Sequence, residues 1–145
     1  MLIVNLGGEG EEIDAIPVPP GSTILHVNPL DYPEEFVMAP LRSGFGRRLR
    51  PGHELIRRLT HDTGLPDQYA DAVVGQSFPI QMNTTPDLTP IGDLAAEAYR
   101  ICKPGGQLAL HCSSCDRQAL VRAFQVAGFI DVHLDQRRYA RSRRP

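Results

Sequence analysis

The sequence contains no apolar run close to the ~20 residues that a membrane-spanning helix requires. Its first residues, Met1 to Asn5, carry no basic group of the kind that opens a secretory signal peptide. Cysteine occurs 3 times, and without a secretion signal so few cysteines do not indicate a disulfide framework. We therefore expect a protein of a reducing, cytoplasmic compartment with no membrane contact.

Lysine and arginine are absent from residues 1–41, and Lys103 is the only lysine in the chain. Arginines gather in residues 42–58 and again in residues 137–144. The net charge is −2, so the chain as a whole lacks the basic surface typical of nucleic-acid-binding domains. The second arginine cluster could contact phosphates, but a terminal arginine run is more often solvated. We predict a basic C-terminal tail over residues 136–145, with nucleic acid as a less favoured partner.

The composition is that of an ordinary globular domain, with 41% apolar and 22% charged residues. Short apolar runs bounded by turn residues predict strands at residues 2–6, 23–27, 71–75, 108–112 and 129–134. Amphipathic spacing and helix-end signals predict helices at residues 32–41, 91–101 and 116–127. Residues 53–61 fit either a helix or a strand.

Strands that alternate with helices predict an α/β domain, with a mostly parallel sheet and helices on both faces. One domain over residues 1–135 contains all these elements. A full helix between residues 11 and 22 is excluded, because Glu11–Ile16 is short and prolines follow it directly. No further strand is expected after Leu134.

A glycine-rich loop, Gly7-Gly8-Glu9-Gly10, directly follows the first predicted strand. Glycines allow a ligand to approach the backbone closely and adopt positive φ at little cost. In nucleotide-binding α/β proteins such a loop often faces the ligand. A glycine-rich turn by itself is a weak indication of a binding site.

The second half of the chain carries a succession of more specific motifs. An acidic residue precedes a Leu-Pro turn in Asp62-Thr63-Gly64-Leu65-Pro66, and Asp71-Ala72-Val73 opens the next strand. Lys103-Pro104-Gly105-Gly106 and Ala127-Gly128-Phe129 then precede the last two predicted strands. In order and spacing this succession resembles class I S-adenosylmethionine-dependent methyltransferases. The resemblance implies a Rossmann-like methyltransferase fold with about five to six strands, truncated at both ends.

The same resemblance implies a site for S-adenosylmethionine at the carboxyl ends of the strands. The glycines after the first strand would lie beneath the methionine part of the cofactor. Asn28 would meet the ribose hydroxyls, and Asp62 the adenine amino group, with Thr63 supplying backbone. The implied cofactor-binding residues are Asn5, Gly7, Gly8, Gly10, Asn28, Asp62, Thr63, Gln76 and Ser77.

Departures from the family pattern leave two functions open. Family members carry acidic residues where this chain has Asn5 and Asn28, and a neutral acceptor forms a hydrogen bond about half as strong. The full helix after Gly10 is also missing. The first function is an S-adenosylmethionine-dependent methyltransferase of undefined acceptor. The alternative is a non-catalytic or repurposed module, such as a regulatory subunit or a toxin-like effector domain.

A Cys-x-x-Cys spacing, Cys112 to Cys115, is found in zinc and redox sites. A structural zinc site needs four ligands, so Cys102 or His133 would have to complete the set. Because no second such pair exists, we expect no metal, with Cys112 as a small core residue.

His61 is the one weak candidate for a catalytic base, because the adjacent Asp62 could orient its imidazole. No complete catalytic group can be assigned from the sequence. Exposed strand edges of a small sheet invite pairing with another chain, which makes a homo-oligomer one of the expected states.

Overall fold

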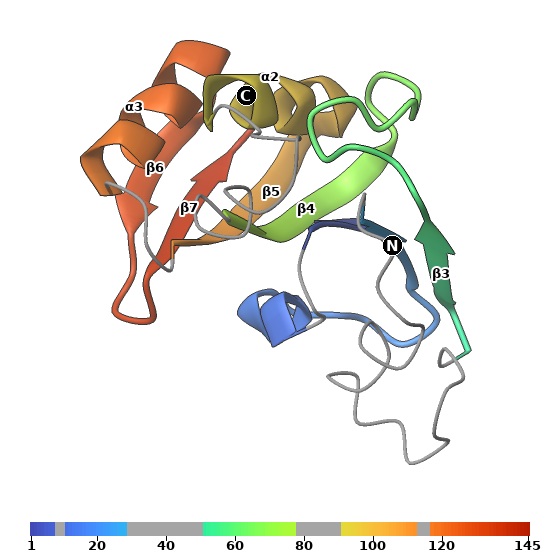
Figure 1. The fold of residues 1–145 in the computed structure, drawn as a ribbon. Coiled ribbons are helices and arrows are strands. Elements are labelled where there is room, and N and C mark those ends of the chain that lie inside the picture. The colour runs from blue at the N-terminus through green and yellow to red at the C-terminus, as the bar shows by residue number, and fades with distance from the viewer. Residues whose placement is uncertain (8–10, 29–50, 78–90, 113–116) are drawn as a thin grey trace.

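In the computed structural model the described residues are 1–7, 11–28, 51–77, 91–112 and 117–145. They form one seven-stranded sheet of order β3-β2-β1-β4-β5-β7-β6 (Figure 1). The strands are β1 (Leu2–Leu6), β2 (Thr23–Val27), β3 (His53–Ile56), β4 (Ala70–Ser77), β5 (Cys102–Cys112), β6 (Ile130–Leu134) and β7 (Tyr139–Arg143). Within the described residues, no helix is both long and apolar enough to cross a membrane.

Parallel pairing runs through the first five strands, from β3 across β2, β1 and β4 to β5. Among the described strands, β7 runs antiparallel to both of its neighbours, β5 and β6. The carboxyl ends of the parallel strands therefore lie at one edge of the sheet. In open α/β sheets this edge is where ligands bind.

Two helices, α2 (Ile91–Ile101) and α3 (Arg117–Ala127), cover one face of the sheet (Figure 1). Their apolar sides pack on the main core, in which Phe124 and Ile101 are among the largest fully buried side chains. The short 3₁₀ helix η1 (Glu11–Ala15) packs through Ile13 on the opposite face. Strands β1 and β2 are almost continuously buried, as expected for parallel strands covered on both faces.

The predicted secondary structure is largely confirmed. The helices at 91–101 and 116–127 are α2 and α3, and the strands at 2–6 and 23–27 are β1 and β2. The exclusion of a full helix before residue 22 is also confirmed, since the described part of that segment forms only η1. The ambiguous segment begins with a strand, β3. The helix predicted at 32–41 lies outside the described residues.

The prediction of a basic tail over residues 136–145, separate from a domain ending at 135, is wrong. Tyr139–Arg143 forms β7, which inserts between β5 and β6 and makes the sheet seven-stranded rather than five- to six-stranded. Ala140 and Ser142 are buried, whereas the arginines of the strand project from the other side. Because arginines are frequent in residues 137–144, the sequence does not show this alternation of buried and exposed side chains as a strand pattern.

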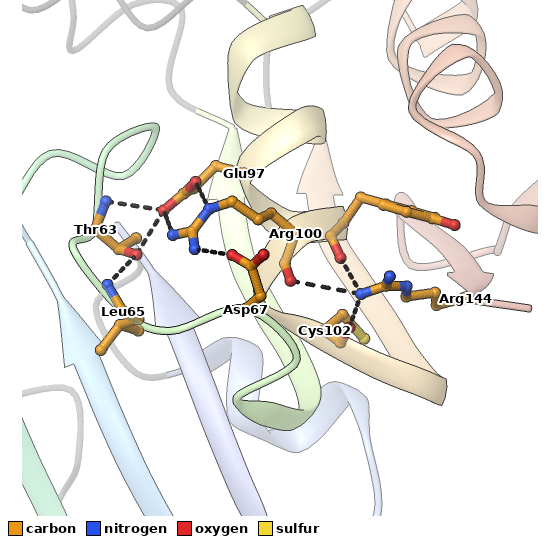
Figure 2. Close-up of polar contacts among 8 residues, drawn as sticks. Thr63, Leu65, Asp67, Glu97, Arg100, Cys102 and Arg144 are labelled. Atoms are coloured by element: carbon orange, nitrogen blue, oxygen red, sulfur yellow. Dashed lines mark hydrogen bonds and ion pairs between the residues drawn. The ribbon is translucent and has the colours of Figure 1, made fainter.

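The arginines of this segment are held by the rest of the chain. The Arg141 Nε donates to Asp135 at 2.6 Å, and the Arg143 Nε donates to Asp131 at 2.7 Å. The Arg144 guanidinium donates to the carbonyl oxygen of Tyr99, in the last turn of α2. It also donates to that of Cys102, directly after the helix (Figure 2). A cation at a helix C-terminus satisfies carbonyls that have no partner within the helix.

Gly105 and Gly106, which the sequence places before a predicted strand, lie within β5. Helix α2 ends at Ile101, β5 begins at once with Cys102, and the Lys103–Gly106 segment is part of the strand. A Cβ atom on Gly106 would lie 2.8 Å from the Lys103 carbonyl oxygen and 2.9 Å from that of Asp71. Only glycine allows β4 and β5 to approach this closely here.

Candidate functional site

Gly7 and Asn28 lie side by side at the carboxyl edge of the sheet. The Gly7 amide donates to the Val27 carbonyl at 2.8 Å, and the Asn28 amide donates to the Ile56 carbonyl at 3.1 Å. Gly7 has a φ of 71°, a conformation that favours glycine, and it directly follows the last residue of β1. Both residues are buried. The ends of β1, β2 and β3 are thus tied together where the resemblance places the cofactor.

The turn between β3 and β4 carries the predicted adenine residues. Asp62 is exposed, and its amide donates to the Leu59 carbonyl at 3.1 Å. Thr63 is only 2% exposed, and both its amide and its hydroxyl donate to Glu97 Oε1, at 3.0 and 2.6 Å (Figure 2). Because the Thr63 amide already donates to Glu97, it is not available to adenine, contrary to the role that the resemblance implies. Thr63 instead anchors the turn.

Glu97 lies on α2 and is 8% exposed. Burial opposes its ionisation, but hydrogen bonds from Arg100 and Thr63 outweigh burial, so the pKa of Glu97 lies below its usual value. The Arg100 guanidinium reaches both carboxylate oxygens, at 2.8 Å to Oε2 and 2.7 Å to Oε1. It also donates to Asp67 at 2.6 Å, and both carboxylates raise the pKa of Arg100. The carboxylate of Glu97 is therefore ionised and fixed.

Our sequence reasoning did not identify Glu97 and its partner Arg100, which hold the turn that carries Asp62. The sequence does contain an indication of the role of Glu97. This charged residue lies on the apolar side of an amphipathic helix, between Leu94 and Ile101. A buried carboxylate requires partners, and Arg100 is one turn away. The other partner, Thr63, is 34 residues distant in sequence, so only the fold reveals it.

Asn5 and two histidines form a chain of polar contacts across β1, β2 and β3. The Asn5 Nδ2 lies 3.1 Å from His26 Nδ1, and the His26 Nε2 lies 3.1 Å from His53 Nδ1. The two imidazoles stack with centroids 5.3 Å apart. Burial, together with the charge of His53, lowers the pKa of His26 to about 4. The side chain of Asn5 thus contacts the His26 imidazole.

The pKa of His26 predicts a loss of stability in acid. In the unfolded chain His26 takes up a proton near its ordinary value of 6.5, whereas the folded protein resists protonation until about pH 4. The unfolded state therefore binds more protons between these values, and stability falls as the pH falls through that window. At about 1.4 kcal/mol per pKa unit, we expect a loss of about 2–3 kcal/mol between pH 7 and pH 4.5.

Urea unfolding at a series of pH values measures this effect. A His26→Gln variant is expected to show a shallower decline than the wild type over the same window. His133→Gln, at an exposed position of β6, controls for the loss of one imidazole. A decline of equal steepness in His26→Gln and the wild type would contradict the assignment to His26.

Several of the predicted site residues, or their side chains, lie outside the described part of the structure. Gly8, Gly10 and Cys115 lie outside the described residues, and the side chains of Gln76, Ser77 and Cys112 are likewise not described. Gln76 and Ser77 are placed by their backbone near the end of β4, at the carboxyl edge. His61 is half-buried in the turn that pairs Leu59 with Asp62, and its role as a base stays a prediction.

Cys102 cannot complete a metal site with Cys112, because the two residues lie at opposite ends of β5. Cys102 is buried, and burial raises the pKa of its thiol to about 11. Within the described ranges, no cluster of three or more His, Cys, Asp and Glu residues could hold a metal ion.

Comparison with known proteins identifies the fold. Neither a protein-family model nor a curated protein sequence matches the chain. A methyltransferase from Aquifex aeolicus that depends on S-adenosylmethionine has a TM-score of 0.66 and 14% identity, over 99% of this chain and 80% of that one. The 1,6-didemethyltoxoflavin-N1-methyltransferase of Burkholderia thailandensis, solved with S-adenosylhomocysteine, has a TM-score of 0.60 and 13% identity, over 99% and 70%. This chain has the class I methyltransferase fold.

A possible exported protein of Bordetella parapertussis has a similar fold, with a TM-score of 0.67 and 16% identity. The match covers 99% of this chain, which spans 61% of the length of the Bordetella protein. At these identities the likeness establishes the architecture of the sheet and its helices. It leaves the activity to be argued from the site.

Proposed function

We propose that this protein binds S-adenosylmethionine at the carboxyl edge of β1, β2 and β3 and transfers its methyl group to an acceptor. The observation that carries the proposal is the methyltransferase fold, with Gly7, Asn28 and Asp62 after its first three strands. These are the positions at which the sequence resemblance expects cofactor contacts.

The chemistry of these residues fits the cofactor. The ribose hydroxyls and the adenine amino group are hydrogen-bond donors, and they need acceptors. The Asn28 amide oxygen and the Asp62 carboxylate are acceptors, and Asp62 is exposed in its turn. Gly7, with its positive φ, permits close approach of a ligand to the backbone.

When bound, the cofactor supplies a methyl group activated by a sulfonium centre. The role of the protein is to hold that methyl group in line with the acceptor, because correct orientation of the reactants by itself can supply much of the acceleration of methyl transfer. His61, next to Asp62, is the candidate to remove a proton from the acceptor. The acceptor itself is left open, as a small molecule or a macromolecule.

Calorimetry with S-adenosylhomocysteine, together with thermal unfolding, tests the proposal. We expect a measurable heat and a rise in Tm that grows with ligand concentration. Asp62→Ala is expected to weaken binding about 10- to 100-fold, because a hydrogen bond to a charged acceptor contributes about 1.5–3 kcal/mol. Asp14→Ala, an exposed acidic residue of η1, is the matched control.

The alternative is a repurposed module of the same fold, and two departures from the family pattern motivate it. The segment after the glycine loop forms only the five-residue η1, and the side chain of Asn5 contacts His26. Folded protein that shows neither heat nor a Tm shift at millimolar ligand would exclude the methyltransferase and support this alternative. A homo-oligomer would then pair the edge strands β3 or β6.

A further inference from the structure

We propose that Glu97 is a positioning residue for the cofactor, which it affects by fixing the turn that carries Asp62. This inference rests on the proposed function and identifies a residue of α2 that does not itself need to touch the ligand. Its basis is the network between α2 and the turn of residues 62–68 (Figure 2).

The turn is held first at Thr63. One oxygen of Glu97 accepts both the amide and the hydroxyl of Thr63, at 3.0 and 2.6 Å. The same hydroxyl accepts the Leu65 amide at 3.1 Å, so the backbone is fixed on both sides of Gly64. Asp62 precedes Thr63 directly, and its position therefore depends on these bonds.

The far end of the turn is held by the same helix. The Gln68 amide donates to the Arg100 carbonyl at 2.8 Å, and the Arg100 side chain donates to Asp67. Arg100 also donates to both oxygens of the Glu97 carboxylate, including the one that Thr63 uses, as Figure 2 shows. Residues 63 and 68 are thus both attached to the last turns of α2.

Burial makes the Thr63 end the stronger attachment. Thr63 and Glu97 are almost fully buried, where hydrogen bonds to a charge are strong and an unsatisfied donor is costly. The Asp67 side chain, in contrast, is 74% exposed, so its ion pair with Arg100 is weak. Loss of the Glu97 carboxylate is therefore expected to release the turn at Thr63 and Asp62, while loss of Asp67 leaves the turn in place.

The test compares Glu97→Gln with Asp67→Asn by titration with S-adenosylhomocysteine and by hydrogen exchange of the free protein. The amide introduced by Glu97→Gln keeps one acceptor oxygen, but its N–H donors face the guanidinium of Arg100. We expect affinity to fall about tenfold and exchange at residues 63–65 to accelerate about tenfold in Glu97→Gln. Asp67→Asn is expected to stay within about twofold of the wild type in both measurements.

The outcomes separate this inference from the proposed function. Wild-type protein that does not bind the ligand overturns both. Wild-type binding combined with unchanged affinity, or unchanged exchange, in Glu97→Gln overturns only the role of Glu97. Should Glu97→Gln fail to fold, Thr63→Val removes the 2.6 Å hydroxyl bond at similar volume, and unchanged affinity in that variant overturns the role equally.

Discussion

Deletion of residues 136–145 is expected to abolish cooperative folding. These residues include β7, which lies between β5 and β6, so its removal breaks two strand pairings at once. It also exposes the core beneath Ala140 and removes the Arg144 guanidinium from the carbonyls at the end of α2. Together these losses are expected to outweigh the ~5–15 kcal/mol by which domains are usually stable. Circular dichroism and thermal unfolding of the shortened chain measure the result.

Arg137→Ala provides the control for loss of charge alone. Arg137 is exposed in the turn between β6 and β7, and a surface substitution of this kind usually changes stability by less than about 0.5 kcal/mol. A shortened chain that unfolds at the wild-type temperature would show that residues 136–145 lie outside the folded domain.

Phe124→Ala is expected to lower the free energy of unfolding by about 3–5 kcal/mol, as is usual for truncating a buried phenylalanine. Phe124 lies on α3, is fully buried, and packs edge-on against Phe129 with ring centroids 5.6 Å apart. Alanine removes this contact and leaves a cavity between α3 and the sheet that rigid neighbours fill only in part. Urea unfolding at neutral pH measures the loss.

Val126→Ala is the matched control, two residues further along the same helix. Val126 is 88% exposed, so little buried surface is lost. Alanine also has the higher helix propensity, and we expect stability to stay within about 0.5 kcal/mol of the wild type, or to rise slightly. A cost below about 1 kcal/mol for Phe124→Ala would contradict the packing of α3 on the sheet.

The helices and strands that could be predicted from the sequence are those marked by a pattern of residues within a short segment. Helix α2 could be predicted because Leu94, Ala98 and Ile101 recur at helical spacing and Lys103-Pro104-Gly105 follows. Strands β1, β2 and β4 could be predicted because short apolar runs end at turn residues. The motif succession from Asp62 to Val132 then indicated the methyltransferase fold, which the structural comparison confirms.

The candidate site could be predicted only in part. Gly7 and Asn28 follow predicted strands, so their place near the carboxyl edge was implied by the parallel sheet. The place of Asp62 was implied by the family resemblance, because the segment before it fits either a helix or a strand. The network that fixes Asp62 was missed, because Glu97 and Thr63 come from segments 34 residues apart. The contact between Asn5 and His26 was missed as well, because it depends on the register between β1 and β2.

Strand β7 is the element that only the tertiary structure decided. In the sequence, Tyr139–Arg143 lies within an arginine-rich segment and lacks the apolar content typical of a strand. In the fold, Asp135 and Asp131 pair with Arg141 and Arg143, and the alternate residues Ala140 and Ser142 enter the interior. The free energy that orders β7 comes mainly from backbone pairing with β5 and β6 and from burial of Ala140, because the Arg143–Asp131 ion pair is largely exposed and contributes little. The sequence by itself determined the elements that have a local periodicity. Residues 139–143 lack such a pattern, and they form a strand because β5 and β6 supply hydrogen-bond partners for their backbone on both sides.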